Sequence, residues 1–79
     1  MYPTVVRIHP NALKALGFGA TAFYEKVKNG LLPPPFKLGQ RACALMDTEI
    51  TAINKARAAG VSDDEIRVLV VKLIDDRTK

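Results

Sequence analysis

Three consecutive prolines at positions 33–35 are the feature that most constrains the fold of this chain of 79 residues. Proline fixes φ and lacks a backbone N–H, so residues 31–35 cannot be helical and must be extended. Glycines at positions 17, 30 and 60 add further breaks, because glycine adopts the left-handed conformation that ends helices. The chain therefore has to fold as several short elements around one small core.

Two short helices are predicted before the prolines. The first starts near Pro10 and ends at Gly17, and the second spans residues 20–28 and ends at Asn29-Gly30. Two helices joined by a glycine-containing turn are typical of helix-turn-helix units. The inward side chains of the second helix and the turn before it are expected to be Phe18, Phe23 and Val27.

A β-hairpin is predicted after the prolines. Residues 36–38 and 42–45 are two short β-prone runs around a turn that contains Gly39, which places Gln40 and Arg41 at the tip. Residues 5–8 form another β-prone run that could pair with a later strand.

Two further helices are predicted in the last part of the chain. Asp47 is expected to cap a third helix over residues 48–58, and Ser62 opens a capping box with Glu65 for a fourth. Arg77 and Lys79 suit the C-terminal end of that helix dipole. The expected inward residues are Ile50, Ile53 and Ala56 on the third helix and Ile66, Leu69, Val70 and Leu73 on the fourth.

The apolar side of the fourth helix is broader than one stripe requires, because Val68, Val71 and Ile74 widen it. We expect this helix to pack over the small core, and the alternative is a self-association surface. The fold class is thus mainly α with a small β-hairpin, a winged helix-turn-helix with an extra C-terminal helix. Within this single domain, residues 1–60 form the winged module, and residues 61–79 form a helix packed on it or used in self-association.

Positive charge is concentrated in the first part of the chain. Residues 1–46 contain six Lys or Arg residues against one acid, whereas residues 47–79 contain six against seven. A one-sided basic excess on a small domain is typical of a protein that approaches a polyanion. Double-stranded DNA is therefore the first partner to consider.

Other classes of function find little support in the residues. The single cysteine, Cys43, allows no internal disulfide and has no companion for a zinc site. We see no nucleophile–base pair, metal cluster or phosphate-binding glycine loop, so we expect no enzyme, no cofactor and no metal. No signal peptide is visible, and the longest apolar run, residues 68–71, is far shorter than a membrane span. The expected location is the cytoplasm, on the nucleoid, away from membranes.

The chain resembles the AlpA family of phage-type transcriptional regulators, which are related to excisionases and to the winged module of MerR-like proteins. The matching motifs are Leu-Gly-Phe at 16–18, Phe-Tyr at 23–24, Lys-Asn-Gly-Leu-Leu-Pro at 28–33 and Phe-Lys-Leu-Gly-Gln-Arg at 36–41, with a matching tail at 57–67. The likeness covers most of residues 5–77. The chain departs from the family pattern where relatives carry Ser and Arg on the second helix, since it has Gly19, Ala20 and Glu25 there.

The resemblance implies that the second helix enters the major groove and that the hairpin lies over the neighbouring backbone or minor groove. Lysines would then contact phosphates, and polar side chains would contact phosphates or base edges. Tyr24 could equally cover the core with its ring. The candidate DNA-binding residues are Ala20, Thr21, Tyr24, Lys26 and Lys28 on the helix, Lys37, Gln40 and Arg41 on the hairpin, and Arg7.

The expected function is sequence-specific DNA binding that regulates transcription in a mobile element such as a prophage, for example of an integrase gene. One alternative is an excisionase, a recombination directionality factor that bends attachment-site DNA. A second is a protein-interaction adaptor that uses the C-terminal helix. The expected protein partners are a recombinase or integrase, RNA polymerase, or further copies of the chain on DNA.

Overall fold

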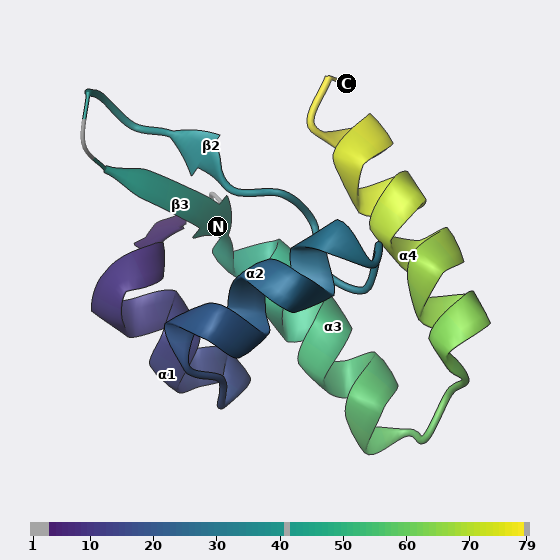
Figure 1. The fold of residues 1–79 in the computed structure, drawn as a ribbon. Coiled ribbons are helices and arrows are strands. Elements are labelled where there is room, and N and C mark those ends of the chain that lie inside the picture. The colour runs from purple at the N-terminus through teal and green to yellow at the C-terminus, as the bar shows by residue number, and fades with distance from the viewer. Residues whose placement is uncertain (1–3, 41, 79) are drawn as a thin grey trace.

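The computed structural model of this protein describes residues 4–40 and 42–78 (Figure 1). The described chain is mainly helical with one small antiparallel sheet, which confirms the predicted class at that level. Its elements in chain order are β1 (Val5–Arg7), the irregular helical turn η1 (Ile8–Ala12), α1 (Leu13–Leu16), α2 (Ala20–Lys28), β2 (Phe36–Lys37), β3 (Cys43–Met46), α3 (Asp47–Ala58) and α4 (Asp63–Asp76).

The sheet has three strands in the order β1-β3-β2, and both pairings are antiparallel. Val6 pairs with Leu45 across β1 and β3, and Lys37 pairs with Cys43 across β2 and β3. The hairpin after the prolines and the later pairing of residues 5–8 are thus both confirmed. Figure 1 shows the hairpin extending from one end of the molecule, on the side away from α4.

The break between α1 and α2 lies where it was predicted: α1 ends before Gly17, and α2 begins at Ala20. Gly17 has a φ of +80°, and the carbonyl of Leu13 accepts hydrogen bonds from the N–H groups of Gly17 and Phe18 at 2.9 and 3.1 Å. α2 covers the predicted residues, and Phe23 is its fully buried side chain. Phe18 and Val27 are partly buried against the same core.

The start of α3 differs from the prediction. β3 continues into α3 without a loop, so Asp47 is already helical and Met46 is the N-cap residue. The Asp47 carboxylate accepts hydrogen bonds from the N–H and hydroxyl of Thr4 at 3.1 and 2.9 Å. Glu49 takes over the capping role and accepts a hydrogen bond from the Met46 N–H at 2.9 Å. The prediction of Asp47 as the cap was wrong because it assumed a connection between strand and helix.

A single buried core contains residues both from the chain before α4 and from α4 itself. Ser62 caps α4 as predicted, since its hydroxyl accepts a hydrogen bond from the Glu65 N–H at 3.2 Å. α4 then adds two buried side chains to residues from the sheet, α2 and α3. The buried cluster consists of Ile8, Ala12, Leu16, Phe23, Leu32, Leu45, Ile50, Ile53, Ile66 and Val70.

The broad apolar side of α4 is only half used in this packing. Leu69 and Leu73 are partly buried, but Val68 and Val71 remain 70% and 67% exposed. The expected packing of α4 on the core is thus present through Ile66, Leu69, Val70 and Leu73, and the two valines lie outside it. α4 lies at the edge of the molecule beside α3, and its outer side faces away from the other elements of the described chain (Figure 1).

In the described residues, no helix combines the length and the apolar character that crossing a membrane requires.

Candidate nucleic-acid interface

The exposed side of α2 carries the predicted polar residues of the helix. Thr21, Tyr24 and Lys28 are exposed at spacings of three and four residues, which places them in one row along the helix. Ala20 is exposed at the first position of the helix, and Glu25 borders the row as an exposed acid. We refer to Thr21, Tyr24 and Lys28 as the α2 row.

The Tyr24 side chain both contacts the buried core and faces solvent. Its ring meets the ring of buried Phe23 edge-on, with centroids 5.1 Å apart and an interplanar angle of 88°. The residue nevertheless keeps 45% of its surface exposed. The ring therefore rests on the core residue while the side chain remains accessible from the α2 row.

Lys26 lies on another side of α2. Each helical residue is rotated by about 100° from the last, so Lys26 points well away from Tyr24 and Lys28. It is partly buried, and its Nζ lies 5.9 Å from the ring centroid of Phe18. The structure thus separates Lys26 from the α2 row.

The turn between α1 and α2 is held in place by α3. Arg57 donates a hydrogen bond from Nη1 to the Leu16 carbonyl at 2.8 Å, and its guanidinium carbon lies 4.6 Å from the Phe18 ring centroid. Asn54 donates from Nδ2 to the Ala15 carbonyl at 3.0 Å. The last carbonyls of α1, which have no partner inside the helix, are therefore capped from α3.

The end of α2 is held in the same way by α4. Arg67 donates from Nε to the Asn29 carbonyl at 3.0 Å and from Nη1 to Asp64 at 3.0 Å. Gly30 follows with a φ of +78°, which turns the chain out of the helix against the Arg67 side chain. Arginines of α3 and α4 thus hold the turn between α1 and α2 and the C-terminal end of α2. Sequence reasoning missed these contacts.

The β2–β3 hairpin presents a short exposed tip with both polar and apolar side chains. A hydrogen bond of 2.7 Å from the Leu38 N–H to the Ala42 carbonyl closes it, and Lys37, Leu38 and Gln40 are exposed. Arg41, the other residue predicted at the tip, lies outside the described residues.

The sheet separates two of the predicted contacts. Arg7 pairs with Ala44 and Ala44 with Phe36, so their three side chains share one face of the sheet. Lys37 follows Phe36 along β2 and projects from the opposite face. The structure therefore does not bring Arg7 and Lys37 together on one face.

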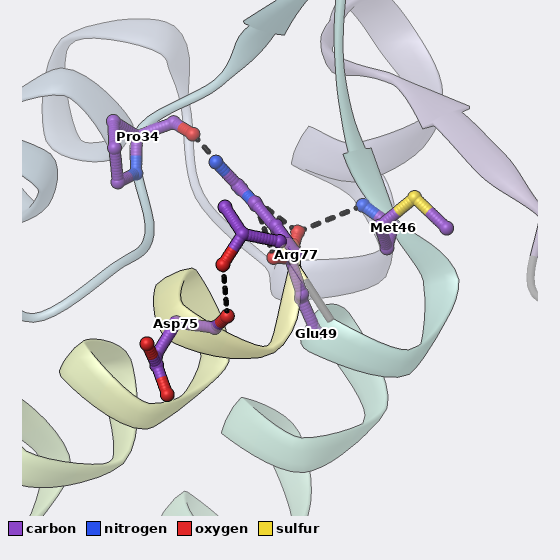
Figure 2. Close-up of polar contacts among 6 residues, drawn as sticks. Pro34, Met46, Glu49, Asp75 and Arg77 are labelled. Carbon is purple, nitrogen blue, oxygen red and sulfur yellow. Dashed lines mark hydrogen bonds and ion pairs between the residues drawn. The ribbon is translucent and has the colours of Figure 1, made fainter.

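A polar clamp at the end of α4 holds the proline segment and β2. Arg77 binds the carboxylate of Glu49 and donates from Nη2 to the Pro34 carbonyl at 3.0 Å (Figure 2). Its guanidinium carbon also lies 5.2 Å from the ring centroid of Phe36. Beside this clamp is a mostly apolar groove of about 580 Å³, lined by Phe36, Met46, Thr48, Glu49, Leu73, Asp76 and Arg77.

The arrangement can bind through exposed side chains. The described residues contain no group of three or more His, Cys, Asp or Glu side chains that could hold a metal ion. Cys43 is a free, partly buried thiol in β3. The exposed hydroxyl, amide and ammonium groups of the α2 row and the hairpin offer hydrogen bonds and positive charge.

Comparison of the chain with protein-family models, with curated proteins and with solved structures yields no match.

Proposed function

We propose that this protein binds double-stranded DNA as a winged helix-turn-helix, with α2 as the recognition helix and the β2–β3 hairpin as the wing. The observation that carries the proposal is the α2 row of Thr21, Tyr24 and Lys28, which is exposed on a helix held at the preceding turn by Arg57 and at its C-terminal end by Arg67. A helix held in this way presents its outer side chains in one geometry, which direct readout of base edges requires.

The residues divide by the contact that each would make. Thr21 and the Tyr24 hydroxyl would hydrogen-bond to bases or phosphates, and Ala20 at the start of α2 would approach a thymine methyl. Lys28 and, on the hairpin, Lys37 would contact phosphates. Gln40 and Arg41 would belong to the tip, with Arg41 beside a narrow minor groove. Lys26 and Arg7 would contribute through the general field of the protein, because neither shares the α2 row or the Lys37 face.

The orientation of the basic side chains supports an approach by this half of the molecule. In residues 47–78, the arginines at 57, 67 and 77 point to backbone carbonyls or carboxylates of the protein itself. Lys14, Lys28 and Lys37 in the first part are exposed, and so are Lys55 and Lys72 in the second. The second part also carries exposed acids at 63, 64, 65, 75 and 76, whereas the first has only Glu25. The net outward positive charge therefore lies on the part that carries α2 and the hairpin, as polyanion binding favours.

The resemblance to the AlpA family suggests the biological role: a regulator of transcription in a mobile element, acting for example on an integrase gene. An excisionase-like directionality factor needs the same module. Deleting the gene and comparing integrase transcript with excision frequency separates the two roles, because a regulator changes the transcript first. A recombinase or RNA polymerase would be the corresponding protein partner, and DNA binding would place the protein on the nucleoid.

Fluorescence anisotropy tests the proposal directly. Labelled duplexes covering the DNA around the gene are titrated at several salt concentrations beside a scrambled duplex. The proposal expects one duplex to be preferred at moderate salt. Lys28→Ala and Lys37→Ala should each weaken binding and lower the slope of log K against log salt by about 0.9, because each removes one phosphate contact.

Lys55→Ala is the matched control, since Lys55 is an exposed lysine on α3 outside the proposed contact residues. Its affinity and salt slope should stay at the wild-type values. Unchanged slopes in a combined Lys28→Ala, Lys37→Ala variant would overturn the proposal.

A second candidate function is a protein-interaction adaptor. The observation that favours it is the exposure of Val68 and Val71 on α4, far from the α2 row in sequence. An adaptor would retain its cellular function when Lys28 and Lys37 are replaced and would lose it when Val71 is replaced by Asp.

A further inference from the structure

The outer side of α4 has a specific chemical pattern. Val68 and Val71 lie next to each other on it, one helical turn apart, and are 70% and 67% exposed. At about 100° per residue, Glu65 and Lys72 fall together on one flank of this valine pair, and Arg67 and Ile74 fall on the other. We refer to the valines and these two flanks as the outer face of α4.

The two flanks differ in how they are used within the chain. Arg67 is engaged with the Asn29 carbonyl and with Asp64, so it is committed to holding α2. Glu65 and Lys72 are exposed, and neither side chain makes a hydrogen bond or ion pair within the described residues. The acid precedes the valine pair and the base follows it. When two copies of this flank run in opposite directions, the acid of each copy therefore faces the base of the other.

A second copy of the same helix fits this pattern better in one direction than in the other. In a parallel pairing around the valines, the flank with Glu65 and Lys72 would face the flank with Arg67 and Ile74. Glu65 would then have to pair with Arg67, which already binds the Asn29 carbonyl and Asp64, and Lys72 would face Ile74. In an antiparallel pairing, the flank that carries Glu65 and Lys72 faces itself. With a rise of about 1.5 Å per residue, Glu65 and the second copy's Lys72 then differ by only about 3 Å along the axis.

We propose that α4 pairs antiparallel with α4 of a second copy of this chain, around a two-fold axis between Val68 and Val71. Val68 packs on the second copy's Val71, and Glu65 pairs with the second copy's Lys72, so that each contact occurs twice. Asp64 approaches Asp75 of the second copy at each end of the pair. The Asp64 carboxylate already pairs with Arg67 of its own chain at 3.0 Å, which reduces the repulsion between these two acids.

The pairing surface is small, because each copy contributes one valine pair and one flank. The contact area is smaller than that of a stable dimer interface. We therefore expect a dissociation constant on the order of high-micromolar to millimolar in free solution. Two copies bound at neighbouring positions on a polymer would raise each other's effective concentration. The inference itself does not depend on DNA binding.

Sedimentation equilibrium without DNA tests the direction of pairing. The wild-type chain is compared with Lys72→Glu, Glu65→Lys and the double variant that carries both changes. Each single change places like charges opposite each other twice and should weaken the dimer at least several-fold, whereas the double variant should restore it. Lys55→Glu makes the same change of charge on α3 and should leave the dimer intact.

Carbodiimide cross-linking provides an independent readout with the unmodified chain. The reagent joins a carboxylate and an amine in direct contact as an amide with loss of water, so a covalent dimer should carry a bond between residues 65 and 72. A wild-type chain that stays monomeric at millimolar concentration overturns the proposal. So does a dimer linked elsewhere, or a double variant no better than the single variants. All these assays omit DNA, so their failure is distinct from failure of DNA binding.

Discussion

Arg77 and Glu49 form a two-pronged ion pair that joins the end of α4 to the first turn of α3. Nε of Arg77 lies 2.5 Å from Oε2 of Glu49, and Nη2 lies 2.9 Å from Oε1. Paired guanidinium–carboxylate contacts of this kind are among the strongest side-chain hydrogen bonds. Glu49 is only 2% exposed, so its charge depends on this partner and on the Met46 N–H.

Arg77→Met should therefore lower the free energy of unfolding by about 3 kcal/mol, because it leaves a buried carboxylate without its counter-charge. Urea denaturation followed by circular dichroism measures the change. Adding Glu49→Gln to Arg77→Met should recover part of the loss, since the buried charge is then gone. Equal stability of Arg77→Met and the wild type would contradict a stabilising role for the pair.

Arg57→Ala should cost about 1–2 kcal/mol, because it removes both the cap on the Leu16 carbonyl and the guanidinium packed on Phe18. Lys26→Ala is the natural comparison. Lys26 sits at 5.9 Å from the same ring and donates no hydrogen bond within the described residues, so we expect a loss within about 0.5 kcal/mol. Thermal unfolding of both variants should show the larger drop in Tm for Arg57→Ala, and the reverse order would disprove this ranking.

Gly30→Ala should destabilise the protein by about 1 kcal/mol. The residue has a φ of +78°, which an L side chain rarely adopts, although the added methyl would meet Arg67 only at an ordinary 3.6 Å. Gly39→Ala serves as the control, because Gly39 has no left-handed φ and nothing lies within 4 Å of an added Cβ. Chemical denaturation should therefore separate the two alanines, with Gly39→Ala close to the wild type.

Tyr24→Phe should leave stability unchanged and weaken DNA binding several-fold. The phenylalanine ring keeps the edge-on contact with Phe23, while the hydroxyl that would bind DNA is lost. Anisotropy titration against the preferred duplex measures the second effect and thermal unfolding the first. If Tyr24→Phe binds as tightly as the wild type, the tyrosine serves only as a cover for Phe23.

Local signals in the sequence were sufficient for several elements. Gly17 ends α1 with a left-handed φ, α2 spans residues 20–28 as expected, and Ser62 caps α4. Each of these signals acts over a few residues, through backbone conformation or a neighbouring hydroxyl, so the sequence around it is enough. The class of the fold, mainly helical with a small sheet, follows from the same short-range pattern.

Contacts between distant residues were not predictable in this way. Arg57, Arg67 and Arg77 each reach a carbonyl about forty positions away, and no periodicity marks such pairs. The prediction for Asp47 was wrong for a related reason, since its partner is Thr4, the residue before β1. The same limit applies to the candidate site. The helical spacing predicted the α2 row. The separation of Lys26 from that row, and of Arg7 from Lys37, is visible only in the packed structure.

The two kinds of basic side chain do different work in this molecule. Guanidinium groups at 57, 67 and 77 hold the elements together, whereas the ammonium groups of Lys14, Lys28, Lys37, Lys55 and Lys72 remain accessible. A reagent that acylates amines, or an enzyme that acetylates lysine, would therefore remove outward charge while leaving these guanidinium contacts in place. The outward ammonium charge of the protein can thus be removed chemically while the arginine contacts that hold its elements together remain.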